Sequence, residues 1–263
     1  MNSAGAICNF KCVSECAAKC CGGATMITID EIVRLYDAFP ITIGFRKYAP
    51  LDEGHEAFLE AIGTRLGKFY IVGDFIAGNW RKNRCSRLGS DNLCTLQKEG
   101  RKPYQCTIMP FCAIYPEEKQ NIVFLSQHES AFRKCSGYAP GSETENVIWK
   151  DGRFVSAQYS EAFSRFRRGM LKQSGFMNNL LGELRKQTVF SRFLLGDGIL
   201  ETAIPTHMIV QLLNLAGLEK NLQDDFARRQ RAFCLEELRY SDQRIAVFED
   251  SIIAFKGLQN ESS

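Results

Sequence analysis

Histidine is scarce in this sequence, and long apolar segments are missing. Only three histidines occur in 263 residues, at His55, His128 and His207, and none stands close to a cysteine pair in a zinc-finger arrangement. We therefore expect each histidine to be a solvated or core residue rather than a metal ligand. A helix that crosses a bilayer needs about 20 consecutive, mainly apolar residues, and the sequence contains no such run.

Excess charge of one sign is also absent. The chain has 33 basic and 30 acidic residues, a net charge of +3, with both signs mixed along its length. This balance gives no indication of binding to nucleic acid or to a membrane surface. The segment from Met1 to Ile7 lacks the basic and apolar regions of a signal peptide. We therefore expect a cytoplasmic protein that has neither nucleic acid nor a membrane as its partner.

Cysteine, in contrast, is abundant and unevenly distributed. Ten of the eleven cysteines precede residue 136, and only Cys234 follows. A disulfide framework fits badly, because the count is odd, the expected compartment is reducing, and Cys20 and Cys21 are adjacent. Buried thiols that act as small apolar residues would explain two or three of them but not the clustering. We interpret the clustered cysteines as metal ligands.

The first cysteines recur at every fourth position, and a fifth follows directly. They are Cys8, Cys12, Cys16, Cys20 and Cys21. On an α-helix a step of four residues rotates by about 400°, so successive thiols drift by only about 40°. The spacing predicts a stripe of thiols on a short helix, or on a helix-like turn distorted by the metal, that Gly22 and Gly23 terminate. Such a stripe is a suitable surface for binding metal.

A second set of cysteines lies farther along the chain, among glycines, prolines and short apolar pieces. Its members are Cys85, Cys94, Cys106, Cys112 and Cys135. We expect the region 84–116 to gain its order from bound metal. An all-sulfur ligand set narrows the choice to Cys₄ zinc or an iron–sulfur cluster. The gaps of eight, eleven and five residues between the first four favour one or two iron–sulfur clusters, of the 4Fe-4S type, with zinc as the alternative.

The hydrophobic patterns predict an α+β, mainly helical fold in two domains. Residues 1–145 would form a small cysteine-rich metal-binding domain with short strands, and residues 146–263 a helical domain. The boundary is placed at the Gly- and Pro-containing loop 137–144. We expect helices at 28–39, 53–66, 157–186, 188–196, 205–217 and 222–255, strands at 24–27, 68–75 and 122–125, and a hairpin at 149–154. Cys234 lies in the last helix and is assigned to core packing.

Several motifs follow one another in an order that resembles the YkgJ-type cysteine-cluster family, which is described as a zinc- or iron-chelating domain. They are Cys12, Cys16 and Cys20-Cys21, Ile27-Thr28-Ile29-Asp30-Glu31-Ile32, Cys85-Ser86-Arg87-Leu88, Cys94, Lys102-Pro103-Tyr104-Gln105-Cys106 with Pro110-Phe111, and Cys135-Ser136-Gly137. The resemblance covers residues 8–140. Two features depart from the family pattern: the opening cysteines are more evenly spaced, and Lys102 stands where the family has arginine.

The resemblance implies a metal-binding protein, with ligands among the ten clustered cysteines. The wider family includes flagellin lysine N-methylases, so redox chemistry or methyl transfer to the lysine of a protein substrate is implied as well. Gly73-Asp74-Phe75-Ile76-Ala77-Gly78 matches an S-adenosylmethionine motif too loosely, and a strand end with a turn is the better interpretation. Arg101, Lys102 and Tyr104 could orient thiolates or simply be exposed. The alternative function is a non-enzymatic, zinc-stabilised module whose helical half docks a protein partner.

Overall fold

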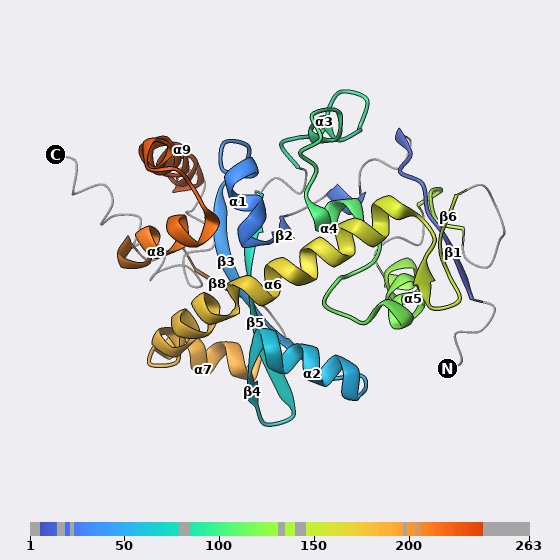
Figure 1. Ribbon diagram of the computed structural model, residues 1–263, viewed down its shortest axis with the longest axis horizontal. Helices are drawn as coiled ribbons and strands as arrows, with labels where there is room; N and C mark the ends of the chain where they lie inside the picture. Colours follow the sequence, from blue (N-terminus) through green and yellow to red (C-terminus); the bar gives the residue numbers. More distant parts are fainter. Residues whose placement is uncertain are drawn as a thin grey trace. The chain divides into compact units, whose positions relative to one another are not determined.

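The computed structural model describes residues 6–14, 19–21, 24–78, 85–130, 135–139, 146–196, 199–202, 204 and 206–238. Among these residues more lie in helices than in strands, which confirms the predicted α+β, mainly helical class (Figure 1). None of the described helices is both long and apolar enough to cross a membrane.

The chain divides into two compact units that do not follow the predicted boundary at residue 145. The first unit consists of Met1–Thr25 and Asn79–Arg168, and the second of Met26–Gly78 and Gly169–Ser263. The division differs because a strand from the last third of the chain, Leu200–Thr202, pairs with a strand at Ile41–Tyr48. Backbone pairing between such distant segments leaves no signal in local composition.

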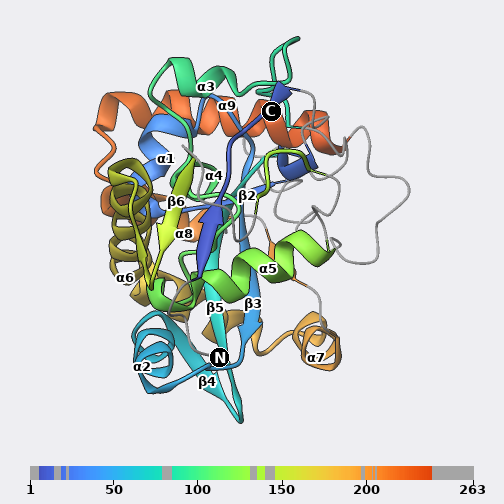
Figure 2. The same cartoon turned by 90° about the vertical axis from the view of Figure 1, so that its right-hand side faces the viewer.

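A five-stranded sheet is the centre of the second unit. Its strands are β2 (Thr25–Ile27), β3 (Ile41–Tyr48), β4 (Gly63–Leu66), β5 (Phe69–Ala77) and β8 (Leu200–Thr202), in the order β2-β5-β3-β8, with β4 also pairing β5. β3 and β5 run antiparallel over their whole common length, and Figure 2 shows them side by side. The sequence analysis predicted all of β2 and most of β5 but no strand at β3.

The helices of the second unit are α1 (Ile29–Leu35), α2 (Glu53–Ile62), α7 (Thr188–Leu195), α8 (Thr206–Ala216), α9 (Lys220–Leu238) and the C-terminal part of α6 (Ala157–Leu184). α6 packs closely on β5 at Gly73, where an added Cβ would lie 2.9 Å from the Cβ of Met177. α2 ends at Ile62 rather than at Leu66, because Gly63 begins the strand β4 that pairs with β5. The predicted helices at 157–186 and 188–196 are confirmed within two residues.

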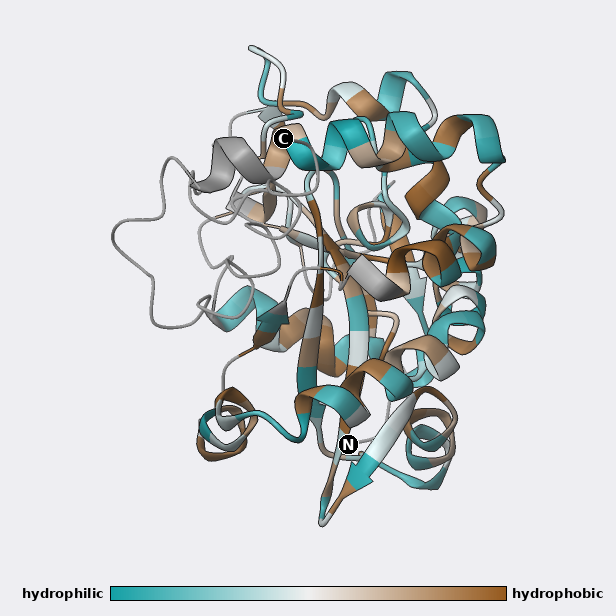
Figure 3. Cartoon of the chain, turned by 90° about the vertical axis from the view of Figure 1, so that its left-hand side faces the viewer, coloured by the Kyte–Doolittle hydropathy of each residue, from teal (hydrophilic) through white to brown (hydrophobic). Residues whose placement is uncertain are grey.

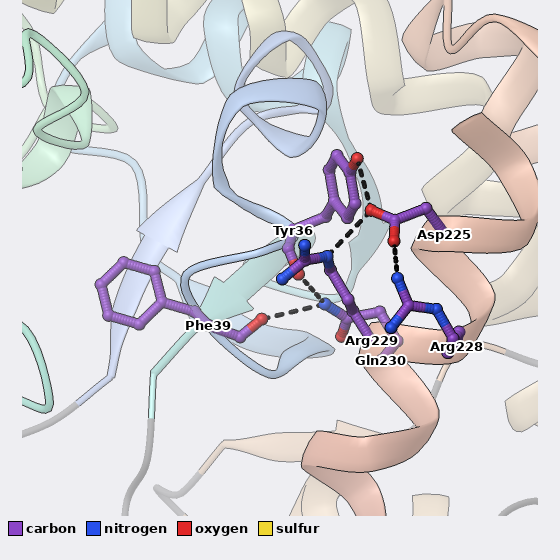
Figure 4. A network of polar contacts seen from close by, with 6 residues as sticks. All are labelled: Tyr36, Phe39, Asp225, Arg228, Arg229 and Gln230. Atoms are coloured by element: carbon purple, nitrogen blue, oxygen red, sulfur yellow. Dashed lines mark hydrogen bonds and ion pairs between the residues drawn. The ribbon is translucent and has the colours of Figure 1, made fainter. Parts of the chain in front are cut away.

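Polar contacts connect α9 to α1 and to the start of β3 (Figure 4). The Gln230 amide donates to the carbonyls of Tyr36 and Phe39 at 2.7 and 2.9 Å, and its oxygen accepts from Ile41 N–H at 2.9 Å. Asp225 accepts a 3.0 Å hydrogen bond from the Tyr36 hydroxyl. In Figure 3 α9 has mostly hydrophilic turns interrupted by hydrophobic ones, as expected for a helix that buries one side.

A three-stranded sheet and several short helices make up the first unit. The strands are β1 (Ile7–Asn9), β6 (Val147–Lys150) and β7 (Arg153–Phe154), in the order β1-β6-β7. The helices are α3 (Thr95–Lys98), α4 (Tyr104–Thr107), α5 (Gln120–Ser130), the 3₁₀ turns η2 (Lys19–Cys21) and η3 (Glu117–Lys119), and the N-terminal part of α6. The predicted hairpin is confirmed, and its turn places Asp151 and Gly152 at φ values of 50° and 91°.

Two predicted elements of the first unit are wrong. The strand expected at 122–125 lies inside helix α5. The cysteine helix is not formed at its start, because Cys8 lies in strand β1 and pairs with Trp149 of β6. At Cys8, therefore, the four-residue spacing of the cysteines does not reflect a helix.

Candidate metal centre

Cys20 and Cys21 form a close pair of thiols. They lie in the 3₁₀ turn η2, and their Sγ atoms are 4.0 Å apart, within hydrogen-bonding distance for sulfur. This hydrogen bond, together with the positive charge of Lys102, lowers the pKa of Cys20 to about 7, although burial acts in the opposite direction. The same hydrogen bond, followed by burial, raises the pKa of Cys21. One thiolate of the pair is therefore stabilised by its neighbour.

Backbone contacts bring the loop after residue 85 to this pair. Cys85 N–H donates to the carbonyl of Cys21 at 2.7 Å, which fixes the two segments against each other. The loop then folds back on itself, because Leu88 and Cys94 form an antiparallel bridge and Thr95 N–H donates to the Arg87 carbonyl at 2.9 Å. Cys94 is the N-cap residue of α3.

Cys106 completes this group from helix α4. The pKa of its thiol is raised to about 12, mainly by burial. A hydrogen bond with Thr25 and the charge of Lys102 act to lower this pKa, whereas the charges of Cys85 and Cys94 act to raise it. Burial also raises the pKa of Cys85, and Cys94 adds to this effect. The charges of Cys20, Cys106 and Cys85 contribute to raising the pKa of Cys21. Thiols from three separate stretches of the chain thus share one electrostatic environment.

Three other candidate ligands of the first unit, Cys8, Cys12 and Cys135, lie in other segments. Cys8 is only 2% exposed in β1, and burial raises its pKa to about 12. Cys135 is also buried, and Cys12 is exposed. The segments that contain them meet where Phe10 bridges Tyr138 and Lys11 N–H donates to Gly137 at 3.0 Å.

Two tyrosines, the buried Tyr138 and the half-buried Tyr159, lie near these thiols and were missed by the sequence analysis. Burial raises the pKa of Tyr138, and the charges of Cys135, Cys20 and Cys8 contribute in the same direction. Burial likewise raises the pKa of Tyr159, with smaller effects from Cys12 and Cys20. No local pattern marks a tyrosine of this kind, because its neighbours come from distant segments.

Cys112 lies in a turn before α5 that one side chain holds in place. Gln120 is fully buried, and its amide oxygen accepts from Cys112 N–H at 3.1 Å. Its amide nitrogen donates back to the carbonyl of Cys112 at 2.8 Å. Burial raises the pKa of the nearby Tyr115, and the charge of Cys112 adds to the effect. Gln120 was not singled out from the sequence either.

The remaining predicted residues are placed as follows. His55 is buried in α2, where its Nδ1 accepts from Leu51 N–H at 3.1 Å, and the ring of His128 lies 5.4 Å from that of Tyr138. Both fit the predicted core or surface roles. Arg101 pairs with Glu99 at 3.2 Å. Cys16 and the side chains of His207 and Cys234 lie outside the part of the chain that the structure describes.

Within the described residues, no three histidine, cysteine, aspartate or glutamate side chains are close enough together to hold one metal ion. The charges of neighbouring thiols nevertheless contribute to raising the pKa of Cys21, Cys85 and Cys106. Their chemistry fits an all-sulfur centre, because thiolates are the ligands of iron–sulfur clusters and of Cys₄ zinc. Such a centre would require the loops to close around the metal, as happens when metal binding is coupled to folding.

Comparison with known proteins identified no relative of this chain. No family model, curated protein or solved structure that was compared with the chain matches it. The resemblance to the YkgJ-type family therefore stays a prediction that is based on the cysteine motifs.

Proposed function

We propose that this chain is a metal-binding protein whose first unit binds a cysteine-ligated iron–sulfur cluster. The candidate ligands are Cys20, Cys21, Cys85, Cys94 and Cys106. The observations that support this proposal are the hydrogen bond from Cys85 N–H to the Cys21 carbonyl at 2.7 Å and the charges of neighbouring thiols, which contribute to raising the pKa of Cys21, Cys85 and Cys106. The five cysteines belong to a 3₁₀ turn, a loop and a short helix. Ligands from several loops suit a cluster with four thiolate ligands, and the fifth cysteine would then be a spare or an alternative ligand.

The positive charge of Lys102 supports the same proposal. Each cysteine ligand binds as a thiolate, so four of them bring several negative charges into a partly buried region. Lys102 lowers the pKa of both Cys20 and Cys106, which means that it stabilises their ionised forms. The sequence analysis selected Lys102 as a possible orienting residue, and its electrostatic effect on two candidate ligands agrees with that role.

A second centre would use the other predicted ligands, Cys8, Cys12, Cys16, Cys112 and Cys135. Its support is weaker and comes from Tyr138 and Tyr159. The charges of Cys8 and Cys135 contribute to raising the pKa of Tyr138, and the charge of Cys12 contributes to raising that of Tyr159. A bound cluster would supply one-electron redox chemistry or a site for binding a substrate atom. The buried ring of Tyr138 would limit the access of water to it.

Metal analysis tests the proposal directly. Protein purified without oxygen should be brown and should contain iron and acid-labile sulfide. The Cys20→Ser/Cys21→Ser double variant and the Cys106→Ser variant should each lose most of that iron, whereas Cys234→Ser, at a position assigned to packing, should retain it. A colourless protein with stoichiometric zinc would replace the iron–sulfur proposal by the zinc-stabilised module. A wild-type protein without any metal would refute both.

The enzymatic function stays a prediction from the family resemblance. If the resemblance extends to the lysine methylases, the iron-loaded protein should transfer a methyl group from S-adenosylmethionine to the lysines of a protein substrate. Mass spectrometry of the acceptor would detect each added methyl group. The absence of transfer by a protein that contains its full iron would confine the function to metal binding or redox chemistry.

A further inference from the structure

Two of the candidate cluster ligands have a hydrogen-bond donor against their sulfur atom. The backbone N–H of Arg87 donates to Cys85 Sγ at 3.4 Å. The side chain of Thr25 forms a hydrogen bond with the thiol of Cys106. A cysteine that binds metal has lost its proton, so its sulfur can only accept hydrogen bonds. In the metal-loaded protein, the Thr25 hydroxyl would therefore be the donor and the sulfur of Cys106 the acceptor.

These two donors come from different kinds of structure. Arg87 follows Cys85 by two residues, so this donor and its acceptor belong to the same turn of the cysteine loop. Thr25 is the first residue of strand β2, which is part of the five-stranded sheet. A β-branched side chain has few favourable rotamers about its Cα–Cβ bond. The strand backbone therefore fixes the direction of the Thr25 hydroxyl independently of the cysteine loop.

A donor against a ligand sulfur affects the redox chemistry of an iron–sulfur cluster. Reduction adds one electron from an external reductant, such as dithionite, while every iron–thiolate bond is kept and no proton is transferred. The added negative charge spreads onto the sulfur atoms, so a hydrogen bond to sulfur stabilises the reduced cluster more than the oxidised one. Hydrogen bonds to the sulfurs are accordingly among the factors that set the reduction potential of such clusters.

We infer that Thr25 is a positioning residue whose hydroxyl donates to the sulfur of Cys106 and raises the reduction potential of the bound cluster. The inference rests on the proposed function, because it requires Cys106 to be a ligand of that cluster. The sequence analysis assigned Thr25 only to a short strand, since no local pattern connects it to a cysteine so far along the chain.

The test is a potentiometric titration with dithionite of the full chain, purified without oxygen, followed by the visible absorption of the cluster. Thr25→Val keeps the shape of the side chain and suits a strand, but it lacks the hydroxyl. This variant should retain its iron and sulfide and show a more negative potential than the wild type. Thr25→Ser, which keeps the hydroxyl, should restore the wild-type potential. Thr25→Ala replaces Thr25→Val if the latter does not fold.

Thr107→Val is the matched control for this test. Thr107 directly follows Cys106 in α4, and its hydroxyl donates to the carbonyl of Pro103 at 3.0 Å. Removing this hydroxyl disturbs the same short helix to a similar extent but takes no donor from the Thr25 contact with sulfur. The potential of Thr107→Val should therefore equal that of the wild type.

Four results would overturn the inference while leaving the proposed function intact. They are a wild-type potential in the variants of Thr25 without a hydroxyl, an equal shift in Thr107→Val, a shifted potential in Thr25→Ser, and loss of iron from both Thr25→Val and Thr25→Ala, which would make the role of Thr25 structural. Iron and sulfide analysis of the wild type precedes every titration. A wild type without iron would refute the proposed function itself, so the two failures are distinguishable.

Discussion

Cys85 donates its backbone N–H to the carbonyl of Cys21 at 2.7 Å, and this contact joins two cysteine segments that are far apart in the sequence. Other backbone hydrogen bonds in the described part of the loop are local, between Gly89 and Leu93, Thr95 and Arg87, and Arg101 and Leu96. The Asn92 side chain also donates to the carbonyl of Ser14 at 3.2 Å. The loop thus depends on local turns, on the contacts with Cys21 and Ser14 and, under the proposed function, on metal.

Removing the metal should therefore loosen the cysteine loop selectively. We expect chelation to accelerate hydrogen exchange at the amides of residues 85–106, because metal binding and local order are coupled. The amides of β3 should keep their protection, because they belong to the sheet of the second unit. Exchange monitored by mass spectrometry on peptides would show this difference. Equal acceleration in both regions would contradict the expectation.

The pH dependence of stability should contain a contribution from Asp74. Burial raises the pKa of this carboxyl to about 7, and Glu201 adds to the shift, while Arg46 opposes it. The folded state thus keeps the proton to a higher pH than the unfolded chain, whose carboxyl has a pKa of about 3.9. The contribution of Asp74 to the free energy of unfolding is therefore largest below about pH 4 and decreases as the pH rises to about 7.

Comparison with Asp74→Asn, whose side chain does not titrate, isolates this contribution. Between about pH 4 and about pH 7 the wild type should lose roughly 1–4 kcal/mol of stability relative to the variant, since one pKa unit corresponds to about 1.4 kcal/mol. Urea unfolding at several pH values measures the difference. Parallel stability curves for the two proteins would show that Asp74 titrates normally.

Two glycines with opposite surroundings should respond oppositely to alanine. At Gly73 an added Cβ would lie 2.8 Å from Phe45 and 2.9 Å from Met177, so Gly73→Ala should cost about 1–3 kcal/mol through overpacking. At Gly175, in the middle of α6, nothing lies within 4 Å of an added Cβ. Gly175→Ala should therefore stabilise the protein by about 0.5–1 kcal/mol through helix propensity. Thermal unfolding of both variants tests the pair, and an equal response would contradict the packing argument.

The contact between α9 and α1 should depend on Gln230 far more than on the ion pairs beside it. Gln230→Ala leaves Ile41 N–H and two carbonyls without their partner, which should cost roughly 1–3 kcal/mol. Arg228 pairs with Asp225, but its side chain is 72% exposed, so Arg228→Ala should change the stability by less than about 1 kcal/mol. Denaturant unfolding of both variants would show the difference. Similar losses would mean that the ion pairs dominate this contact.

Local patterns predicted the long helices well, because α6 and α7 show apolar residues at helical spacing. They failed for the short apolar run at 122–125, which suits a strand or a helix equally. In α5 this run buries Val123 and Phe124, while Ile122 and Leu125 remain 40% and 45% exposed. Strand β3 was missed because its pairing partners β5 and β8 lie outside its own sequence window.

The candidate site was predictable in its residue types and not in its arrangement. Cysteine clustering was sufficient to select the thiols, and the family resemblance drew attention to Lys102. It could not indicate that Cys8 would enter a strand opposite Trp149, nor that Gln120 would hold Cys112. Both depend on contacts between distant segments, which the spacing of cysteines does not encode.

Chain connectivity limits how this protein can be shortened. The chain passes between the two units after Thr25, after Gly78 and after Arg168, and the last passage lies inside the continuous helix α6. A fragment of residues 1–145 would retain all ten clustered cysteines but would lack β8, which covers one edge of β3. An uncovered strand edge invites association with other chains. Expression trials and functional assays should therefore use the full-length chain, and a fragment that retains every candidate ligand should aggregate.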